Sequence, residues 1–254
     1  MMMSQQVDWK SHAASVPDHR GAHYVNVLKC AHQWLSPKTY LEIGTAAGGS
    51  LRLAQCAAIS VDPKYSFKTA DFIAHKPFCA LYQMTSDSFF REHNPGRIFD
   101  RPIDLAFLDG MHLCEYLLRD FANTERHCRR NSVIVMDDCV PVEFAIAGRA
   151  PAKPIEAHRA NWWAGDVWRT LLALRKHRPD LALTVVDSPE TGLVFATNLD
   201  PLSTLLTDNY HAIVREMMSL SLEEIGLEEF FAMVCLESTS VIDREDKMSQ
   251  RFSL

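Results

Sequence analysis

Three acidic residues directly follow two apolar runs of the sequence. Asp109 comes after residues 103–108. Asp137 and Asp138 come after residues 132–136. Both runs have the apolar character of strands buried on two faces of a parallel sheet, whose carboxyl ends meet at one edge. Carboxylates gathered there repel one another, and a hard divalent cation with oxygen ligands relieves that repulsion. The sequence therefore predicts a metal site on the three acids, with magnesium favoured. The alternative for the adjacent pair is that it only caps the following loop.

His112 stands three residues after Asp109, where a helix is expected to begin. An imidazole titrates near neutral pH, which suits it to take a proton from a reacting group. We therefore predict that His112 is a general base and that Asp109 belongs to the same catalytic group. A purely structural role for this histidine is the alternative.

A glycine-rich turn in residues 40–50 (YLEIGTAAGGS) is the second candidate site. A short apolar run leads into it, and a helix is predicted after it at residues 50–57. Glycine permits backbone conformations that other residues resist, and a helix start offers unpaired N–H groups to a ligand. These features predict a cofactor-binding turn that consists of Gly44, Thr45, Ala46, Gly48 and Ser50, with Glu42 beside a cationic amine.

Asp62 ends another short apolar run, about 20 residues after the turn, the offset at which a carboxylate meets a ribose diol. A dinucleotide fingerprint would need glycine at position 46, where Ala46 stands. The pattern therefore predicts a nucleotide-like cofactor held by the turn and Asp62. A nicotinamide dinucleotide stays open as the less favoured alternative.

Around the turn the sequence resembles the class I S-adenosylmethionine-dependent methyltransferases. Their first motif, acid-x-Gly-x-Gly-x-Gly, is matched by Glu42, Gly44 and Gly48, and Ala46 departs from it at the middle glycine. The resemblance implies S-adenosyl-L-methionine as the cofactor, with its methionine part along the turn and its ribose on Asp62.

The same resemblance implies further cofactor contacts at the ends of later strands. The class places adenine contacts after the third strand, where Ser86 and Asp87 stand. For Asp87 the alternative is a helix N-cap. Asp109, at the end of the fourth predicted strand, would face both the cofactor and the metal.

The acids resemble those of the metal-dependent small-molecule O-methyltransferases. In the catechol O-methyltransferase type, an acid ends the fourth strand and an acid followed by Asn or Asp ends the fifth. Asp109, Asp137 and Asp138 match these positions. That type carries a lysine as the base three residues after the first acid, whereas His112 makes this chain similar to the macrolide sugar O-methyltransferases. Residues 107–112 (FLDGMH) also resemble the bacterial group named methyltransferase domain 24. The histidine argues against a catechol acceptor and is compatible with the same metal-and-base scheme.

The order of the predicted elements indicates an α/β fold. Five apolar strands alternate with helices, as in a doubly wound parallel sheet, at residues 39–43, 58–61, 78–83, 103–108 and 132–136. The strands predicted at 181–186 and 193–197 have too short a link for a crossover and so form an antiparallel hairpin. We therefore expect a seven-stranded, mostly parallel Rossmann-like methyltransferase sheet with an antiparallel last strand.

Three parts are expected along the chain: an N-terminal helical extension over residues 1–37, a cofactor-binding methyltransferase domain over 38–198 and a helical extension over 199–254. The polar tail at 243–254 is expected to be disordered. Further helices are predicted at residues 21–35, 67–75, 86–93, 113–129, 166–177, 202–220 and 222–234. For the last two, an oligomer contact, an active-site cover and simple packing on the core all stay open.

Composition limits the classes of partner. The net charge is −6, which gives no reason to expect nucleic acid. No apolar run reaches the ~20 residues that a membrane helix needs. The chain has seven cysteines without a Cys-x-x-Cys pair, which argues for reduced thiols in the cytoplasm and against a disulfide framework or a zinc ribbon.

Three functions are compatible with these patterns. The favoured one is divalent-metal-dependent O-methylation of a small hydroxylated metabolite, sugar or natural product, with His112 as the base. The others are a methyltransferase without a metal and a non-catalytic protein that binds S-adenosylmethionine. The tryptophans in residues 161–165 (NWWAG) are candidates for aromatic walls of an acceptor pocket, and equally for core or interface anchors.

Overall fold

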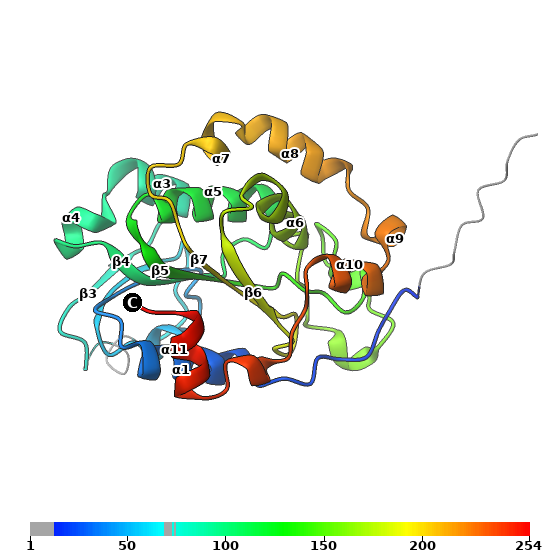
Figure 1. Cartoon of the computed structure of the whole chain (residues 1–254), viewed down its shortest axis with the longest axis horizontal. Coiled ribbons are helices and arrows are strands. Elements are labelled where there is room, and N and C mark those ends of the chain that lie inside the picture. Colours follow the sequence, from blue (N-terminus) through cyan, green and yellow to red (C-terminus); the bar gives the residue numbers. More distant parts are fainter. Residues whose placement is uncertain (1–12, 69–72, 74) are drawn as a thin grey trace, which may run out of the picture.

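Seven strands form one sheet: β1 (Thr39–Ile43), β2 (Ala57–Val61), β3 (Cys79–Tyr82), β4 (Ile103–Leu108), β5 (Cys128–Asp137), β6 (Ala182–Val186) and β7 (Leu193–Thr197). The structure is a computed structural model that describes residues 13–68, 73 and 75–254. The strand order is β3-β2-β1-β4-β5-β7-β6. Figure 1 shows β7 between β5 and β6 in this sheet. The strands from β3 to β5 run parallel, and β7 is antiparallel to both β5 and β6. This topology confirms the predicted doubly wound fold with an antiparallel last strand.

The central strands are buried on both faces, as their apolar sequences predict. All residues of β1 and β4 are buried. Because side chains alternate along a strand, Leu41 packs into one layer of the core and Tyr40 into the other. In β4, Leu108 and Phe107 divide between the two layers in the same way. The strands are therefore fixed from both sides, and so are the residues at their carboxyl ends.

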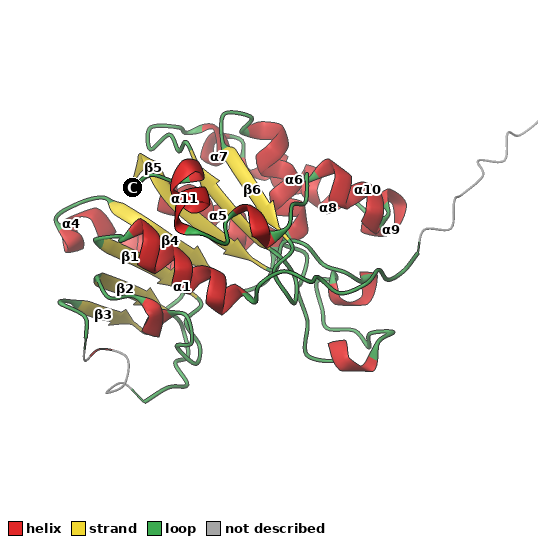
Figure 2. Ribbon diagram, turned by 60° about the horizontal axis from the view of Figure 1, so that its bottom comes forward, coloured by secondary structure: helices red, strands yellow, loops and turns green. Residues whose placement is uncertain are grey.

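Helices cover the two faces unequally (Figure 2). One face carries α1 (Tyr24–Leu35) and α11 (Glu245–Arg251), which contact each other. The larger group is on the other face: α3 (Ser86–Glu92), α5 (Cys114–Glu125), α6 (Trp168–His177), α7 (Leu205–Asp208), α8 (Tyr210–Ser219), α9 (Leu222–Ile225) and α10 (Leu227–Met233), with α4 (Pro95–Phe99) before β4. No helix among the described residues has the length and apolar character needed to cross a membrane.

Several predicted helices are shorter than their sequence patterns indicate. The helix expected at 50–57 is wrong: only a single 3-10 turn, Leu51–Leu53, forms, because β2 already begins at residue 57. The helix expected at 222–234 divides into α9 and α10 at Gly226, whose φ is +83°. The one expected at 202–220 forms only α7 and α8. The expected helix at 67–75 lies largely outside the described residues.

The C-terminal tail is ordered, contrary to the expectation of disorder. Its residues include α11, and the following Phe252 is 2% exposed. The Phe252 ring stacks on Phe195 of β7 with the ring centroids 5.2 Å apart. One buried aromatic side chain thus anchors a segment whose composition is otherwise polar.

Candidate active site

Two adjoining cavities lie at the carboxyl edge of the sheet. The first has a volume of about 470 Å³ and the second a volume of about 430 Å³. Gly44, Asp62 and Gly110 line both cavities. The predicted metal and base residues line the first, and the predicted adenine contacts line the second. The glycine-rich turn therefore lies at the boundary between the two.

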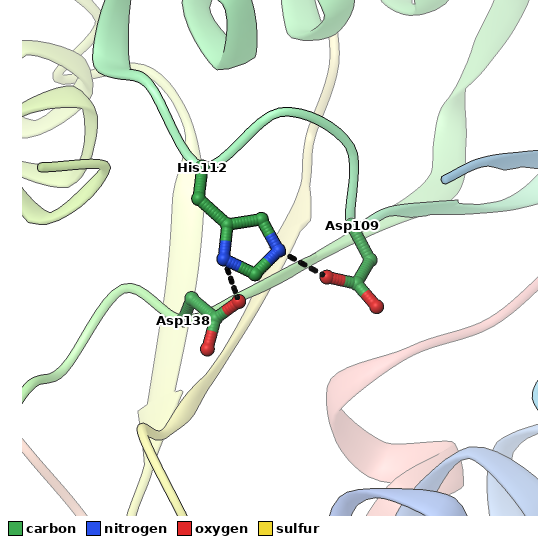
Figure 3. A group of neighbouring side chains, drawn as sticks. All are labelled: Asp109, His112 and Asp138. Carbon is green, nitrogen blue, oxygen red and sulfur yellow. Dashed lines mark ion pairs between the residues drawn. The ribbon is translucent and has the colours of Figure 1, made fainter. Parts of the chain in front are cut away.

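His112 lies between two of the predicted acids (Figure 3). Its Nε2 is 3.3 Å from Oδ1 of Asp109, and its Nδ1 is 3.1 Å from Oδ2 of Asp138. The carbonyl oxygen of Trp163 is 2.9 Å from the same Nδ1, and the two rings stack with their centroids 5.4 Å apart. These contacts fix the ring and favour a proton on Nδ1, so that Nε2 is the atom that can exchange one.

A glycine allows the loop that carries the tryptophans to close on His112. Gly165 has a φ of +65°, and a Cβ placed on it would lie 1.8 Å from the carbonyl oxygen of His112. The next residue, Asp166, donates its N–H to that oxygen over 3.2 Å. Only a residue without a side chain fits this approach, which brings Trp163 against the histidine.

Three carboxyls and one imidazole, that of His112, determine the electrostatics of the site. Burial alone would lower the pKa of His112, but the hydrogen bond to Asp109 and the charges of Asp138 and Asp109 raise it to about 10. Burial raises the pKa of Asp138 to about 7, opposed by the charge of His112. Burial, followed by the charges of Asp138 and Asp109, holds the pKa of Asp137 well above its usual range. No lysine or arginine is among the described residues that line the first cavity.

The three predicted metal ligands all line the first cavity, but they are not equally close. Asp109, His112 and Asp138 each offer a ligand atom within 4.8 Å of the others. Asp137 lies outside this group, and its Oδ1 accepts a hydrogen bond from the N–H of Asp138 over 3.0 Å. Asp138 also accepts a hydrogen bond from the Thr191 hydroxyl over 2.5 Å. His112 therefore belongs to the same cluster as Asp109 and Asp138.

The glycine turn presses directly against the end of β4. Gly44 has a φ of +88°, and a Cβ placed on it would lie 1.8 Å from the carbonyl oxygen of Asp109. Ala46, at the position where the family motif has glycine, also adopts a positive φ of +42°. Its N–H donates to Oδ2 of Asp62 over 2.8 Å, and the N–H of Lys64 donates to Oδ1 over 2.6 Å. Asp62 thereby fixes the turn at the place predicted for the ribose.

Glu42 lies beneath the turn and lines neither cavity. Tyr40 donates its hydroxyl to Oε2 over 2.5 Å, while Oε1 has no hydrogen-bond partner among the residues that the structure describes. Burial raises the pKa of Glu42 to about 7, against the effect of the nearby hydroxyls. Thr45, Gly48 and Ser50 also line neither cavity. These predicted contact residues lie behind the turn rather than on its open surface.

Ser86 and Asp87 line the second cavity at the start of α3. The N-cap of this helix is Thr85, so the alternative of an N-cap at Asp87 is wrong. Both carboxylate oxygens of Asp87 instead accept from Arg119, over 2.8 and 2.7 Å. Apolar walls and a further acid complete the cavity: Ile43, Val61, Pro63, Met111, Tyr116 and Asp120.

Several lining residues of the first cavity carried no signal in the sequence. His23 and Tyr24 come from the start of α1, and Glu190 and Thr191 come from the hairpin between β6 and β7. They reach the cavity through the tertiary fold, and no spacing relates them to the motifs. Trp162 and Trp163 also line this cavity, as expected if they form the aromatic walls of a pocket.

Comparisons with known proteins find one matching family model and several similar solved structures. Residues 41–139 match the model of a family described as a methyltransferase domain. The methyltransferase PaMTH1 of Podospora anserina, solved with SAH, is 15% identical and has a TM-score of 0.48, covering 70% of this chain and 78% of its own. The O-methyltransferase TomG of Streptomyces achromogenes, solved with SAM, is 17% identical with a TM-score of 0.49, covering 68% and 78%. An O-methyltransferase of Bacillus cereus, solved with SAH, is 18% identical with a TM-score of 0.47, covering 71% and 83%. The curated proteins gave no match.

Proposed function

Residues 41–139 match the model of a methyltransferase domain, and from this match we propose that the chain transfers the methyl group of S-adenosylmethionine to a hydroxyl of a small molecule, assisted by a divalent cation. The observation that carries the proposal is the convergence of Asp109, His112 and Asp138 within 4.8 Å, beside the glycine turn. An acid–base group and a cofactor turn at one cavity boundary are what a metal-assisted methyl transfer requires.

The second cavity suits the cofactor and the first suits the acceptor. Apolar walls such as Val61 and Met111 can cover the faces of an adenine ring, and the Ser86 hydroxyl is available at its edge. Asp62 and Gly44 lie where the two cavities meet, so a cofactor in the second would direct its sulfonium toward the first. S-adenosylmethionine supplies an electrophilic methyl group at that boundary.

The donor set suits a hard cation. Asp109, Asp137 and Asp138 would hold it, because carboxylate oxygens are the ligands that magnesium, calcium and manganese prefer. Burial raises the pKa of all three carboxyls, and His112 is the one basic neighbour that opposes this effect, which is an arrangement that a bound positive ion would complete. When bound, such an ion supplies Lewis acidity that lowers the pKa of an acceptor hydroxyl.

The chain's own residues then handle the proton and the orientation. The Trp163 carbonyl keeps the Nδ1 proton of His112 in place, which leaves Nε2 to accept the proton of the acceptor. The Trp163 ring holds the imidazole in one plane by stacking. Because the charges of Asp109 and Asp138 raise the pKa of His112 to about 10, the histidine serves as a base only when those charges are balanced.

The first cavity favours a neutral hydroxylated acceptor. Its walls combine the aromatic faces of Trp162 and Trp163 with hydrogen-bonding groups such as Asn161 and Glu190. The absence of lysine and arginine among its described lining residues leaves a phosphate or carboxylate of an acceptor without a cationic partner. A sugar or another polyhydroxylated metabolite fits this lining.

Calorimetry with S-adenosylmethionine, repeated with magnesium and with chelator, tests the cofactor and its linkage to a metal. A radiolabelled methyl-transfer assay on a panel of sugars and phenols tests the chemistry. We expect binding and metal-dependent transfer. Equal transfer by the wild type and an Asp137→Ala/Asp138→Ala protein in chelator would favour a metal-free methyltransferase. Binding without transfer to any acceptor would favour a non-catalytic role.

A further inference from the structure

Arg159 is a buried arginine that lines neither cavity and that the proposed reaction does not use. It ends the 3-10 turn η3 (Ala157–Arg159), shortly before the tryptophans of the first cavity, and its side chain is 3% exposed. A guanidinium is costly to bury unless its N–H groups are paired. The partners of Arg159 therefore show which parts of the fold it holds together.

Most of these partners belong to the N-terminal strap, which we define as residues 14–19. Nε and Nη2 of Arg159 donate to Oδ1 of Asp18 over 2.9 and 2.7 Å, and Nη2 also donates to the carbonyl oxygen of Val16 over 2.7 Å. Nη1 donates to the hydroxyl of Ser15 over 2.7 Å. One side chain thus binds three residues of the strap, which lie more than 140 positions earlier in the sequence.

The same guanidinium balances a fully buried acid. Nη1 of Arg159 donates to Oε2 of Glu143 over 3.0 Å, and Oε1 of Glu143 accepts the N–H of Ile155 over 2.5 Å. Glu143 is 0% exposed and forms an antiparallel bridge with Ser15 of the strap. In Figure 1 the strap (blue) runs beside the loop that contains η3 (light green). Arg159 and Glu143 together therefore fasten the strap to residues 155–159, and we call this set of contacts the clasp.

The clasp supports one part of the wall of the first cavity. The N–H of Trp162 donates to the carbonyl oxygen of Arg159 over 2.9 Å, so the place of the turn determines the place of Trp162, which lines the cavity. Trp163 has an anchor of its own, because its indole N–H donates to the carbonyl oxygen of Gly148 over 2.8 Å. Arg159 therefore holds the wall at Trp162 separately from the ring that stacks on His112.

We propose that Arg159 is a positioning residue for the acceptor, because it holds Asn161 and Trp162 in the arrangement that binds the molecule to be methylated. The inference rests on the proposed function, since it presupposes an acceptor in the first cavity. A wall that is ordered before binding loses less conformational entropy when the ligand arrives, so loss of the clasp should weaken acceptor binding. The proton transfer at His112 should continue, because Trp163 keeps its anchor. The expected signature is a raised KM for the acceptor with kcat little changed.

The test measures methyl transfer to the sugar or phenol of the panel that the wild type methylates fastest. Arg159→Lys keeps a positive charge beside Glu143 and so preserves the fold, but an ammonium cannot reproduce the fork of hydrogen bonds to the strap. Asp18→Asn changes the other partner, whose side chain is 39% exposed. We expect each variant to raise the KM for the acceptor about 3–10-fold, while kcat and the affinity for S-adenosylhomocysteine stay within about twofold.

Hydrogen exchange of the protein without ligand gives a second readout that needs no acceptor. In both variants the amides of residues 155 and 162 should exchange at least about tenfold faster, because the clasp no longer restrains them, while the amides of β4 should not change.

Arg178→Lys provides the matched control. Arg178 is another buried arginine, 2% exposed, and it donates to both carboxylate oxygens of Glu125 over 2.6 and 2.8 Å. It lines neither cavity and does not contact the strap. This variant should keep the wild-type KM and the wild-type exchange at residues 155 and 162.

A wild-type KM in both Arg159→Lys and Asp18→Asn would overturn the inference, whatever the exchange rates, and would leave the proposed function intact. A raised KM without faster exchange would overturn the positioning role. An equal rise of KM in Arg178→Lys would also overturn it, because general destabilisation would then explain the effect. A folded wild type that transfers methyl groups to no acceptor would overturn the proposed function and with it this inference.

Discussion

Two neighbouring groups of buried and half-buried acids differ in how the fold balances their charge. The arginine cluster consists of Cys114, Glu115, Arg149 and Asp166, and the histidine cluster consists of Asp109, His112 and Asp138. In the arginine cluster, the Arg149 guanidinium is 2.6 Å from Glu115 and 2.9 Å from Asp166. A permanent cation thus balances both acids, and the group fastens the starts of α5 and α6 to the intervening loop.

The histidine cluster has no such cation. Its only basic member is His112, whose charge depends on a proton. The consequence appears in the acids themselves: the hydrogen bond from Arg149 lowers the pKa of Glu115, whereas burial raises the pKa of Asp138 to about 7. The first group is complete as folded. The second leaves its charge balance to something that binds.

The backbone shows the same division. His112 and Asp138 adopt positive φ angles of +54° and +62°, as Ala46 does in the adjoining turn. No member of the arginine cluster has a positive φ. Strained non-glycine residues gather at functional sites, where the surrounding fold compensates for them. Backbone strain therefore lowers stability at the histidine cluster, whereas the arginine cluster stabilises the fold.

The largest effect should follow from removing an acid of the histidine cluster. Asp138→Ala should weaken magnesium or manganese binding at least ~100-fold, more than the loss of a supporting group would, because it removes one of the proposed direct ligands. The free energy of unfolding without metal should not fall, since a carboxylate with a raised pKa is lost. Titration calorimetry and chemical denaturation measure the two quantities.

Glu115→Gln is the control for that experiment, because Glu115 is also an acid near His112 but belongs to the arginine cluster. It should leave cation affinity unchanged. If Asp138→Ala bound the cation as the wild type does, or if Glu115→Gln lost it, the distinction between the two clusters would be wrong.

Removing the arginine should damage stability and spare the metal site. In Arg149→Met the carboxylate of Asp166, whose side chain is 1% exposed, keeps only the 3.5 Å contact to Arg169 as an ion pair. The N–H and the thiol of Cys114 still donate to it. Leaving a buried acid underpaired should cost about 1–3 kcal/mol of unfolding free energy, since Arg149 itself is partly exposed. Urea denaturation measures the loss, and cation affinity should stay within twofold.

An exposed pair supplies the comparison for this change. Arg91 and Glu92 are 67% and 50% exposed, and Arg91→Met should cost no more than about 0.5 kcal/mol. Equal losses in the two arginine variants would show that burial does not distinguish them.

The free energy of unfolding should depend on pH in opposite directions for an acid that has a cationic partner and for one that lacks it. Burial raises the folded-state pKa of Glu42 to about 7 from a usual value of 4.5, so its contribution is present below pH 4.5 and is lost as the pH rises through 7. The pKa of Glu115 is lowered, so its contribution is present above pH 4.5 and is lost on acidification. Unfolding free energies measured from pH 3 to pH 8 should therefore change in opposite ways.

Two substitutions show which residue causes each pH dependence of the unfolding free energy. Glu42→Gln should flatten the fall between about pH 5 and pH 7, where the wild type loses on the order of 1 kcal/mol per pH unit from this group. Glu115→Gln should flatten the acid side alone. A Glu42→Gln protein with the wild-type slope above pH 5 would contradict the assignment.

The sequence could predict the sheet and the acids at its edge because both are local signals. A continuous apolar run specifies a buried strand, and the residue after it, such as Asp109 or Asp138, must lie at the carboxyl edge. His112 stands three residues after Asp109, so its place near this edge could be predicted as well. Its position between the two acids could not be predicted, because it depends on a positive φ and on the close approach of Gly165.

Features that depend on tertiary contact escaped the sequence. Asp120 and Glu190 reach their cavities from a helix interior and a hairpin, and neither has a motif around it. The order of the C-terminal tail depends on Phe252, one apolar residue in a polar stretch. Helical periodicity also overestimated the helix at 50–57, because periodicity does not reveal where the next strand must begin.

The smallest expected effect concerns the strain in the glycine turn. Ala46 is exposed and has a φ of +42°, so its methyl group gains little packing while the backbone pays for a left-handed conformation. Ala46→Gly should raise the unfolding free energy by about 0.5 kcal/mol, the relief of strain less the greater entropy of unfolded glycine. Ser36→Gly, with a φ of +48° at the end of α1, should give a similar gain far from the site. Only Ala46→Gly should weaken S-adenosylhomocysteine binding. Asp62 fixes the N–H of residue 46 in the turn, and a more flexible turn loses more conformational entropy when the ligand binds. A loss of stability in Ala46→Gly with a gain in Ser36→Gly would mean that the alanine side chain supports the turn, and that its departure from the motif is an adaptation rather than a strain.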